Sequence, residues 1–128
     1  MRILVCGGRD YQDWRKIGAV LDELQDVEWL IHGGAKGADY LAGEWAKNRG
    51  IPITVFPADW DRHGRSAGPL RNARMLAEGK PDLVVAFPGG AGTANMVARS
   101  KEAGVRVIEV SPSPNPAPLA PPEPQDGT

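Results

Sequence analysis

The sequence predicts a three-layer α/β fold, a Rossmann-like doubly wound parallel sheet of about five strands in a single domain. Two observations carry this prediction. Short apolar runs alternate with segments of helical periodicity, and paired glycines follow three of the runs. Near-continuous apolar runs are typical of strands buried on both faces, and their alternation with helices indicates parallel strands joined by right-handed crossovers.

The predicted strands are mostly β-branched or aromatic, and each is short. They span Ile3–Cys6, Trp29–His32, Ile53–Phe56, Leu83–Phe87 and Val105–Val110. We assume that their order in the sheet is 3-2-1-4-5, as in Rossmann-like folds. This order places the first and fourth strands at the point where the direction of winding reverses, which is where α/β sheets bind ligands.

Four segments between the strands are predicted helices. In the first, apolar residues follow the i, i+3, i+4, i+7 pattern after Asp13, which we expect to be an N-cap. The other three cover about residues 38–49, 67–78 and 93–103. Each stops at a glycine suited to the left-handed position after a helix, namely Gly50, Gly79 and Gly104.

The distribution of proline divides the chain into two parts. Seven of the 12 prolines fall in residues 111–128, a segment with almost no apolar side chains beyond alanine and Leu119. Such composition predicts an extended, polyproline II-like or disordered tail. The folding unit is therefore expected to be residues 1–110.

Charge and cysteine content limit the classes of function. The formal net charge of −1 argues against a surface built to hold duplex nucleic acid or an anionic membrane. No apolar run has the ~18 residues of a transmembrane helix. Cys6 is the single cysteine, which excludes an internal disulfide and favours a reducing, cytoplasmic setting. His63 has no partner at metal-ligand spacing, so we expect no metal and no required cofactor.

Three predicted strand-to-helix turns contain paired glycines. They are Gly7-Gly8-Arg9-Asp10, then residues 33–39 with Gly33, Gly34 and Gly37, then Pro88-Gly89-Gly90-Ala91-Gly92-Thr93. Parallel strands place all three turns at one edge of the sheet. Glycine lets backbone amides approach an anion, and a helix N-terminus favours negative charge. One such turn more often only closes a tight bend, whereas three at one edge predict a cradle for a phosphate or nucleotide.

Two familiar nucleotide motifs are absent. The chain has no Gly-x-x-x-x-Gly-Lys-Ser/Thr, which excludes a P-loop ATPase. It also lacks Gly-x-Gly-x-x-Gly after the first strand, and the second strand ends in His32 rather than in an acid that would hold a ribose diol. A standard nicotinamide-dependent dehydrogenase is therefore disfavoured.

The turns, read in order, resemble the SLOG superfamily of Rossmann-like proteins, and most closely its YspA-type, cpYpsA-related members. The resemblance runs through the three glycine turns, Ala58–Arg65, and Ala67–Asn72 with Met75, and it covers essentially residues 1–110. The sequence resembles the LOG phosphoribohydrolases and the DNA-processing protein DprA more distantly. The resemblance implies binding of a nucleotide or nucleotide-derived ligand and no particular reaction. Our leading hypothesis is that the protein senses or carries this ligand.

One position departs from the LOG pattern. LOG enzymes carry Pro-Gly-Gly-x-Gly-Thr-x-x-Glu, whose glutamate serves cleavage of the N-glycosidic bond, and the same count here ends at Met96. We expect the helix to aim this residue at the sugar, so that the loss of the carboxylate disfavours LOG-type hydrolysis. An enzyme with a non-standard carboxylate remains the alternative, with Asp39 and Asp10 as candidates.

The predicted ligand-binding residues come from the three turns and from the segment before the fourth strand. They are Gly7, Gly8, Arg9, Gly33, Gly34, Ala35, Gly37, Asp39, Trp60, Arg71, Asn72, Pro88, Gly89, Gly90, Gly92 and Thr93. We expect Arg71 to clamp a phosphate and Asn72 to bind a base edge or a ribose hydroxyl.

The remaining predictions concern partners and packing. Trp60, among arginines, could stack on a base of single-stranded DNA, a DprA-like alternative that the near-neutral charge disfavours. A small nucleotide is the expected partner, and formation of a homo-oligomer is left as an open alternative.

We expect His32 to be a packed, hydrogen-bonded histidine. We also expect Trp14, Trp29 and Trp45 to pack helices on the sheet.

Overall fold

The structure is a computed structural model, and it describes residues 1–112. Five strands form one parallel sheet in the order β3-β2-β1-β4-β5. They are β1 (Arg2–Cys6), β2 (Trp29–His32), β3 (Ile53–Val55), β4 (Leu83–Ala86) and β5 (Arg106–Glu109). The predicted fold class and strand order are confirmed. The predicted tail lies outside the described residues from position 113 onward.

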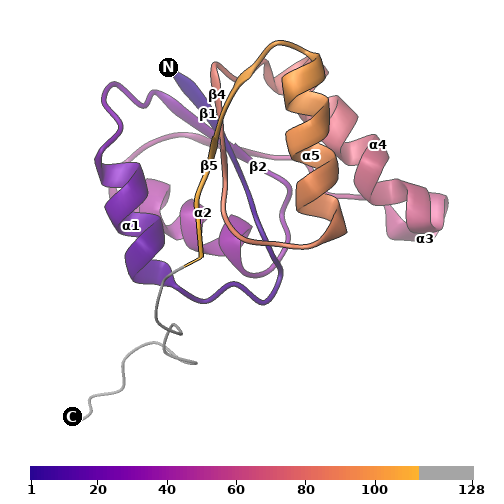
Figure 1. Ribbon diagram of the computed structural model, residues 1–128, viewed down its shortest axis with the longest axis horizontal. Helices are drawn as coiled ribbons and strands as arrows, with labels where there is room; N and C mark the ends of the chain where they lie inside the picture. Colours follow the sequence, from indigo (N-terminus) through magenta and orange to yellow (C-terminus); the bar gives the residue numbers. More distant parts are fainter. Residues whose placement is uncertain (113–128) are drawn as a thin grey trace, which may run out of the picture.

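Helices cover both faces of the sheet (Figure 1). α1 (Trp14–Asp22) and α2 (Ala38–Asn48) lie on one face, and α4 (Ala67–Arg74) and α5 (Ala91–Glu102) lie on the other. Side chains of β1 alternate between the faces: Ile3 and Val5 pack with α1 and α2, whereas Leu4 packs with α5. No helix in residues 1–112 is long and apolar enough to cross a membrane.

Several predicted helix ends are confirmed. The Asp13 side chain caps α1 by accepting a hydrogen bond from the backbone N–H of Lys16 at 3.1 Å. After α2 and α5 the chain turns left-handed at Gly50 and Gly104, where φ is +69° and +76°. These glycines let the chain leave each helix toward the next strand.

The segment between β3 and β4 differs from the prediction at both ends. A short helix, α3 (Trp60–His63), and a 3₁₀ turn, η1 (Gly64–Ser66), precede α4, and neither was predicted because this exposed stretch has no apolar periodicity. At the other end a π-helical turn, η2 (Met75–Gly79), follows α4. The left-handed residue is Lys80, with φ +51°, and not Gly79. Gly79 packs against the sheet instead, and a Cβ there would lie 3.1 Å from Cδ1 of Ile31.

Of the three tryptophans that were predicted to pack helices on the sheet, two are packed and one is not. Trp45 is buried, and Trp29, the first residue of β2, packs against the apolar cluster that contains Met75 and Met96. Trp14 does not fit the prediction, because 41% of it is exposed at the start of α1. An aromatic ring left in solvent at this position is an unused contact surface.

Candidate ligand-binding cavity

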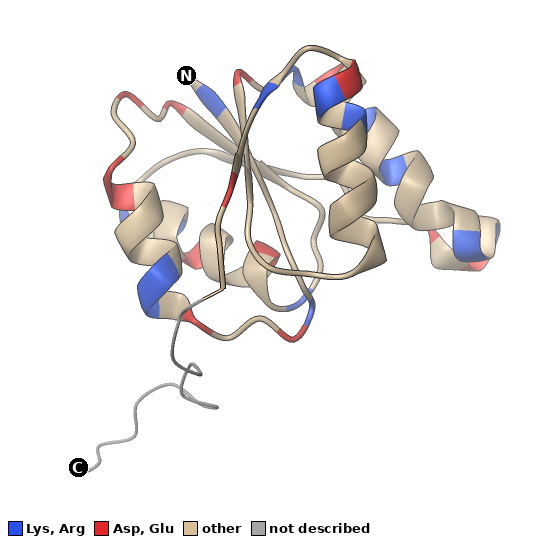
Figure 2. Ribbon diagram, in the orientation of Figure 1, with Lys and Arg blue, Asp and Glu red and all other residues tan. Residues whose placement is uncertain are grey.

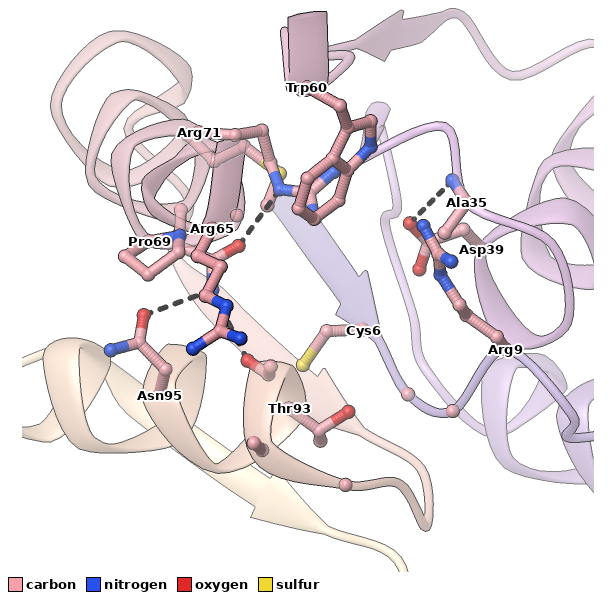
Figure 3. Close-up of a pocket in the computed structure, with 18 residues that line it drawn as sticks. Cys6, Arg9, Ala35, Asp39, Trp60, Arg65, Pro69, Arg71, Thr93 and Asn95 are labelled. Atoms are coloured by element: carbon pink, nitrogen blue, oxygen red, sulfur yellow. Dashed lines mark hydrogen bonds between the residues drawn. The ribbon is translucent and has the colours of Figure 1, made fainter. Parts of the chain in front are cut away.

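A cavity of about 630 Å³ opens between the ends of β1 and β4. These strands are neighbours at the centre of the sheet, where the direction of winding reverses. Four separate segments line the cavity (Figure 3): the turn after β1, the turn after β2, the helical segment from Trp60 to Met75, and the start of α5. The volume falls within the range of about 300–1,000 Å³ that is typical of small-molecule sites.

Most of the predicted ligand-binding residues lie in the cavity wall. They are Gly7, Gly8, Arg9, Ala35, Asp39, Trp60, Arg71, Asn72, Gly90, Gly92 and Thr93. Five others are not in the wall and belong to the turns behind it: Gly33, Gly34, Gly37, Pro88 and Gly89. Asp10, one of the two candidate carboxylates, is exposed and also lies outside the wall.

Close packing explains several of the glycines. A Cβ on Gly37, whose φ is +75°, would lie 2.2 Å from the carbonyl oxygen of Gly8. A Cβ on Gly89 would lie 2.7 Å from the amide nitrogen of Gly8, and one on Gly7 would lie 2.6 Å from Cβ of Ala38. The turn after β1 is thus pressed between the other two turns. These glycines permit that approach and do not face a ligand through the missing side chain.

The turn after β4 presents an uncapped helix end to the cavity. Gly90 is the N-cap of α5, and no side chain caps this end. The first N–H groups of α5, those of Ala91, Gly92 and Thr93, have no carbonyl partner within the helix. A Cβ on Gly90 or Gly92 would meet no atom within 4 Å, so the space there is open. Free N–H groups and the helix dipole together favour an anion at this place.

The turn after β2 is closed by its own side chains. Oδ2 of buried Asp39 accepts hydrogen bonds from the amides of Gly33 at 3.0 Å and Ala35 at 3.2 Å. The amide of Gly34 donates to Nδ1 of His32 at 2.9 Å. These amides are already satisfied and do not offer themselves to a phosphate. The expectation that all three turns provide free amides is therefore wrong for this turn.

Arg71 and Asn72 connect the closed turn to the open one. Nη1 of Arg71 donates to the carbonyl of Gly33 at 2.6 Å, and its Nε donates to Oδ1 of Asn72 at 3.0 Å. Nδ2 of Asn72 donates in turn to the carbonyl of Gly92 at 3.2 Å and to Oδ1 of Asn95 at 3.1 Å. A guanidinium has five N–H donors, so Arg71 keeps donors for a ligand after both of these bonds.

Burial shifts the pKa values of the ionisable side chains in and behind the cavity wall. It raises the pKa of Asp39 to about 6, although the bonds from Ala35 and Gly33 and the charge of Arg71 oppose the increase. It also raises the pKa of the Cys6 thiol to about 12, which keeps that group neutral. The pKa of His32 is lowered by burial and then by Arg71, as fits the packed histidine that the sequence predicted. No group of three or more metal-ligating side chains occurs in the described part of the chain.

Trp60 lies at the mouth of the cavity with two arginines. The residue is 48% exposed, and the guanidinium of Arg9 lies over its indole ring, 5.5 Å from the ring centroid. Figure 3 shows Trp60 extending over the cavity, with Arg65 and Arg9 on different sides of it. A half-exposed indole in this position is suited to stacking on a nucleobase.

Seven lining residues were not predicted: Cys6, Arg65, Gly68, Pro69, Met75, Ala91 and Asn95. Helical spacing could have identified two of them. Met75 lies three positions after Asn72, and Asn95 lies three positions after Gly92, so each shares a helix face with a predicted wall residue. Arg65 belongs to a turn without periodicity and could not have been assigned in this way.

Met96 was expected from the sequence to face the ligand, and the structure shows that this expectation is wrong. Met96 is fully buried in the apolar cluster that also contains Cys6 and Met75, and it is not a lining residue. The reason is packing, because this side of α5 covers the sheet. A glutamate introduced here would place a carboxylate in the core, so we expect Met96→Glu to lower stability rather than to create activity.

Comparisons with known proteins agree with this architecture. A sequence model of the YspA, cpYpsA-related SLOG family matches residues 1–63, which include the turns after β1 and β2. The Gene 61 protein of Mycobacterium phage D29 is 36% identical over 124 residues, and the alignment covers 88% of this chain and 98% of that protein. The chain therefore belongs to the YspA, cpYpsA-related SLOG family of nucleotide-related, Rossmann-like proteins.

Proposed function

We propose that the cavity binds a nucleotide or nucleotide-derived ligand, such as a nucleoside mono- or diphosphate, which the protein senses or carries. The observation that carries the proposal is the uncapped N-terminus of α5, which faces open space in the cavity wall. A phosphate there would accept hydrogen bonds from the free amides of α5 and interact with the positive end of the helix dipole.

Two arginines in the cavity wall add donors for a phosphate, and Arg71 lies on the Asp39 side of the cavity, where its Nη1 binds the carbonyl of Gly33. Arg65 and Arg71 both line the cavity, and Arg71 is held in position by Gly33 and Asn72 while part of its guanidinium is unused. Arginine binds phosphate through two parallel hydrogen bonds, which a neutral group does not offer. A phosphorylated ligand should therefore bind more tightly than the corresponding nucleoside.

The opposite side of the cavity is suited to the sugar and the base. Both hydrogen bonds to Asp39 end on Oδ2, and Oδ1 accepts none from a described residue. That oxygen is an acceptor for a ribose hydroxyl. The exposed ring of Trp60 provides a surface for the base. The ligand would thus lie with its phosphate toward α5 and its nucleoside toward Asp39 and Trp60.

Calorimetric titration with nucleoside mono- and diphosphates, ADP-ribose and the matching nucleosides tests the proposal. We expect the wild-type protein to bind at least one phosphorylated compound. Gly90→Val should abolish this binding without unfolding the chain, because the new side chain would fill the open space in front of α5. Gly18→Val is the matched control, since Gly18 is equally open but lies on α1, outside the cavity wall. Absence of binding across the panel, or equal binding by Gly90→Val, would contradict the proposal.

A second candidate function is hydrolysis of a nucleotide N-glycosidic bond, and one observation favours it. Asp39 is the one carboxylate that residues 1–112 contribute to the cavity wall, and its pKa of about 6 lets it accept a proton from water near neutral pH. Release of free base from nucleoside monophosphates, measured by chromatography, tests this function. Hydrolysis by Asp39 requires activity in the wild type and its loss by ~10²–10⁴-fold in Asp39→Asn. Ligand binding without base release would leave sensing or carriage as the function.

A further inference from the structure

An exposed groove of aromatic side chains lies beside the cavity. It has a volume of about 250 Å³ and is lined by Arg9, Tyr11, Gln12, Trp14, Gly37, Tyr40 and Leu41. Trp14 is 41% exposed and Tyr40 is 60% exposed. We refer to Tyr11, Trp14 and Tyr40 as the aromatic groove. Two large rings left in solvent next to each other are a contact surface that residues 1–112 do not cover.

The groove has the chemistry that binds proline-rich segments. Such segments dock as polyproline II helices on grooves lined by tryptophan and tyrosine. Their backbone carbonyls have no internal hydrogen bonds and need donors. The indole N–H groups of Trp29 and Trp45 donate to Thr54 and Asp22. The indole of Trp14 has no acceptor among the described residues, so it is an available donor in the groove.

The chain leaves the fold close to this groove. The backbone N–H of Val110 donates to the carbonyl of Ala86 at 2.8 Å, which holds the end of β5 beside β4. The residue after Ala86 is Phe87, whose ring centroid lies 5.5 Å from that of Tyr11. Val110 also packs against the apolar cluster that contains Ile17 of α1, and in Figure 1 the described chain ends near the start of this helix in the view shown.

Length and charge favour the chain's own tail as the occupant. At ~3.1 Å per residue a polyproline II segment of residues 113–128 could extend ~50 Å, far more than the groove requires. Residues 111–128 contain two acidic side chains, Glu123 and Asp126, and no basic one. The lining of the groove that residues 1–112 provide has no carboxylate and contains Arg9, and the guanidinium of Arg15 lies 5.2 Å from the centroid of the Trp14 ring. Figure 2 shows basic positions in the first turn of α1 and acidic ones in the loop before it.

We propose that the proline-rich tail, residues 111–128, docks as a polyproline II segment in the aromatic groove of the same molecule, with Trp14 donating a hydrogen bond to a tail carbonyl. A tethered segment is presented at about millimolar effective concentration, so modest intrinsic affinity is sufficient. Arg9 lines both the groove and the ligand cavity, which places the docked tail at the edge of the ligand site. The docking itself does not depend on the proposed function.

The indole N–H signals of the four tryptophans in a ¹H–¹⁵N correlation spectrum test the docking directly. The full chain is compared with a full-length variant carrying Pro112→Ser, Pro114→Ser, Pro116→Ser and Pro118→Ser. We expect the Trp14 signal, assigned with Trp14→Phe, to move by more than its line width between the two chains. The signals of Trp29 and Trp45, whose N–H groups are bonded within the fold, should stay in place.

Two further measurements identify the occupant. Tyr40→Ala, a change at an exposed position, should shift the Trp14 signal toward its position in the serine variant. A synthetic peptide of residues 111–128, added to the serine variant, should move the signal back. An unchanged Trp14 signal in the serine variant would overturn the proposal. A shift that disappears on dilution would overturn it as well, because the occupant would then be a second copy of the chain.

Discussion

The turns after β2 and β4 contain similar glycine-rich sequences but differ in whether their backbone amides already have acceptors. In the first, Asp39 and His32 satisfy the amides of residues 33–35 with side chains from the same chain. Both α2 and α5 begin without a side-chain cap, but Gly37 is pressed against the carbonyl of Gly8, whereas the space in front of Gly90 and Gly92 is open. The closed turn contains its own anion, and the open turn has a place for one.

This difference shows that glycine content alone does not identify a phosphate site. What matters is whether a carboxylate of the protein already accepts from the turn's amides. Asp39 occupies the closed turn from the first turn of α2, whereas the corresponding first turn of α5 has no acidic residue. The substitutions below change residues of these two turns or the side chain that joins them, beginning with the largest expected effect.

The largest effect is expected from Gly37→Ala in the closed turn. The new Cβ would combine a positive φ with a 2.2 Å approach to the carbonyl of Gly8, so the free energy of unfolding should fall by about 3 kcal/mol or more. Gly50→Ala is the control, since Gly50 has a similar φ of +69° with no atom near its Cβ, and should lose only about 1–2 kcal/mol. Urea denaturation measures both. Equal losses would show that the packing of the turn relaxes freely.

Asp39→Asn should change how stability depends on pH. The pKa of Asp39 rises from 3.8 to about 6 on folding, so its stabilising contribution is fully present below pH 3.8 and is lost as the pH rises through 6. The loss corresponds to about 3 kcal/mol at neutral pH. Asparagine keeps an acceptor for the two amides and does not ionise. The stability of the variant relative to wild type should therefore increase between pH 4 and pH 7.

Urea denaturation of both proteins across this pH range provides the measurement for Asp39. The comparison removes the contribution of the other carboxyl groups, which titrate in both proteins. A difference between variant and wild type that stays constant with pH would show that the buried carboxylate does not titrate as the closed turn implies.

Arg71→Ala acts on the side chain that joins the two turns. It should weaken binding of a phosphorylated ligand by ~10–100-fold more than binding of the matching nucleoside, because a charge-assisted contact contributes ~1.5–3 kcal/mol. Calorimetric titration of both ligands gives the ratio. Arg62→Ala is the control, since Arg62 is exposed and lies outside the wall. Equal losses for both ligands would mean that Arg71 acts by holding Gly33 and Asn72 in place.

The smallest effect on stability is expected when a side-chain cap is added at the start of α5 in the open turn. Gly90→Ser would supply the N-cap side chain that α5 lacks and should raise the free energy of unfolding by a few tenths of a kcal/mol. The hydroxyl would then compete with a ligand phosphate for the same amides. Thermal denaturation and calorimetric titration should show slightly higher stability together with weaker ligand binding. Higher stability with unchanged affinity would place the phosphate away from α5.

Parts of the site were predictable because they depend on local sequence. The glycines at the ends of β1 and β4 and the cap at Asp13 follow from short motifs, and the wall positions of Arg71 and Asn72 follow from the family resemblance. The closure of the second turn was not predictable. It depends on which way a carboxylate six residues after Gly33 points, and the same aspartate could equally have faced a ligand.

The sequence by itself determined the α/β class, the five strands and the edge of the sheet at which the glycine turns meet. Hydrophobic periodicity and turn chemistry are properties of neighbouring residues, so they can be read along the chain. Only the tertiary structure decided which turn stays open, that Met96 faces the core, and that Arg65 reaches the cavity from a helical turn without periodicity. These outcomes depend on contacts between segments far apart in the chain, where packing and hydrogen-bond satisfaction select one orientation for each side chain.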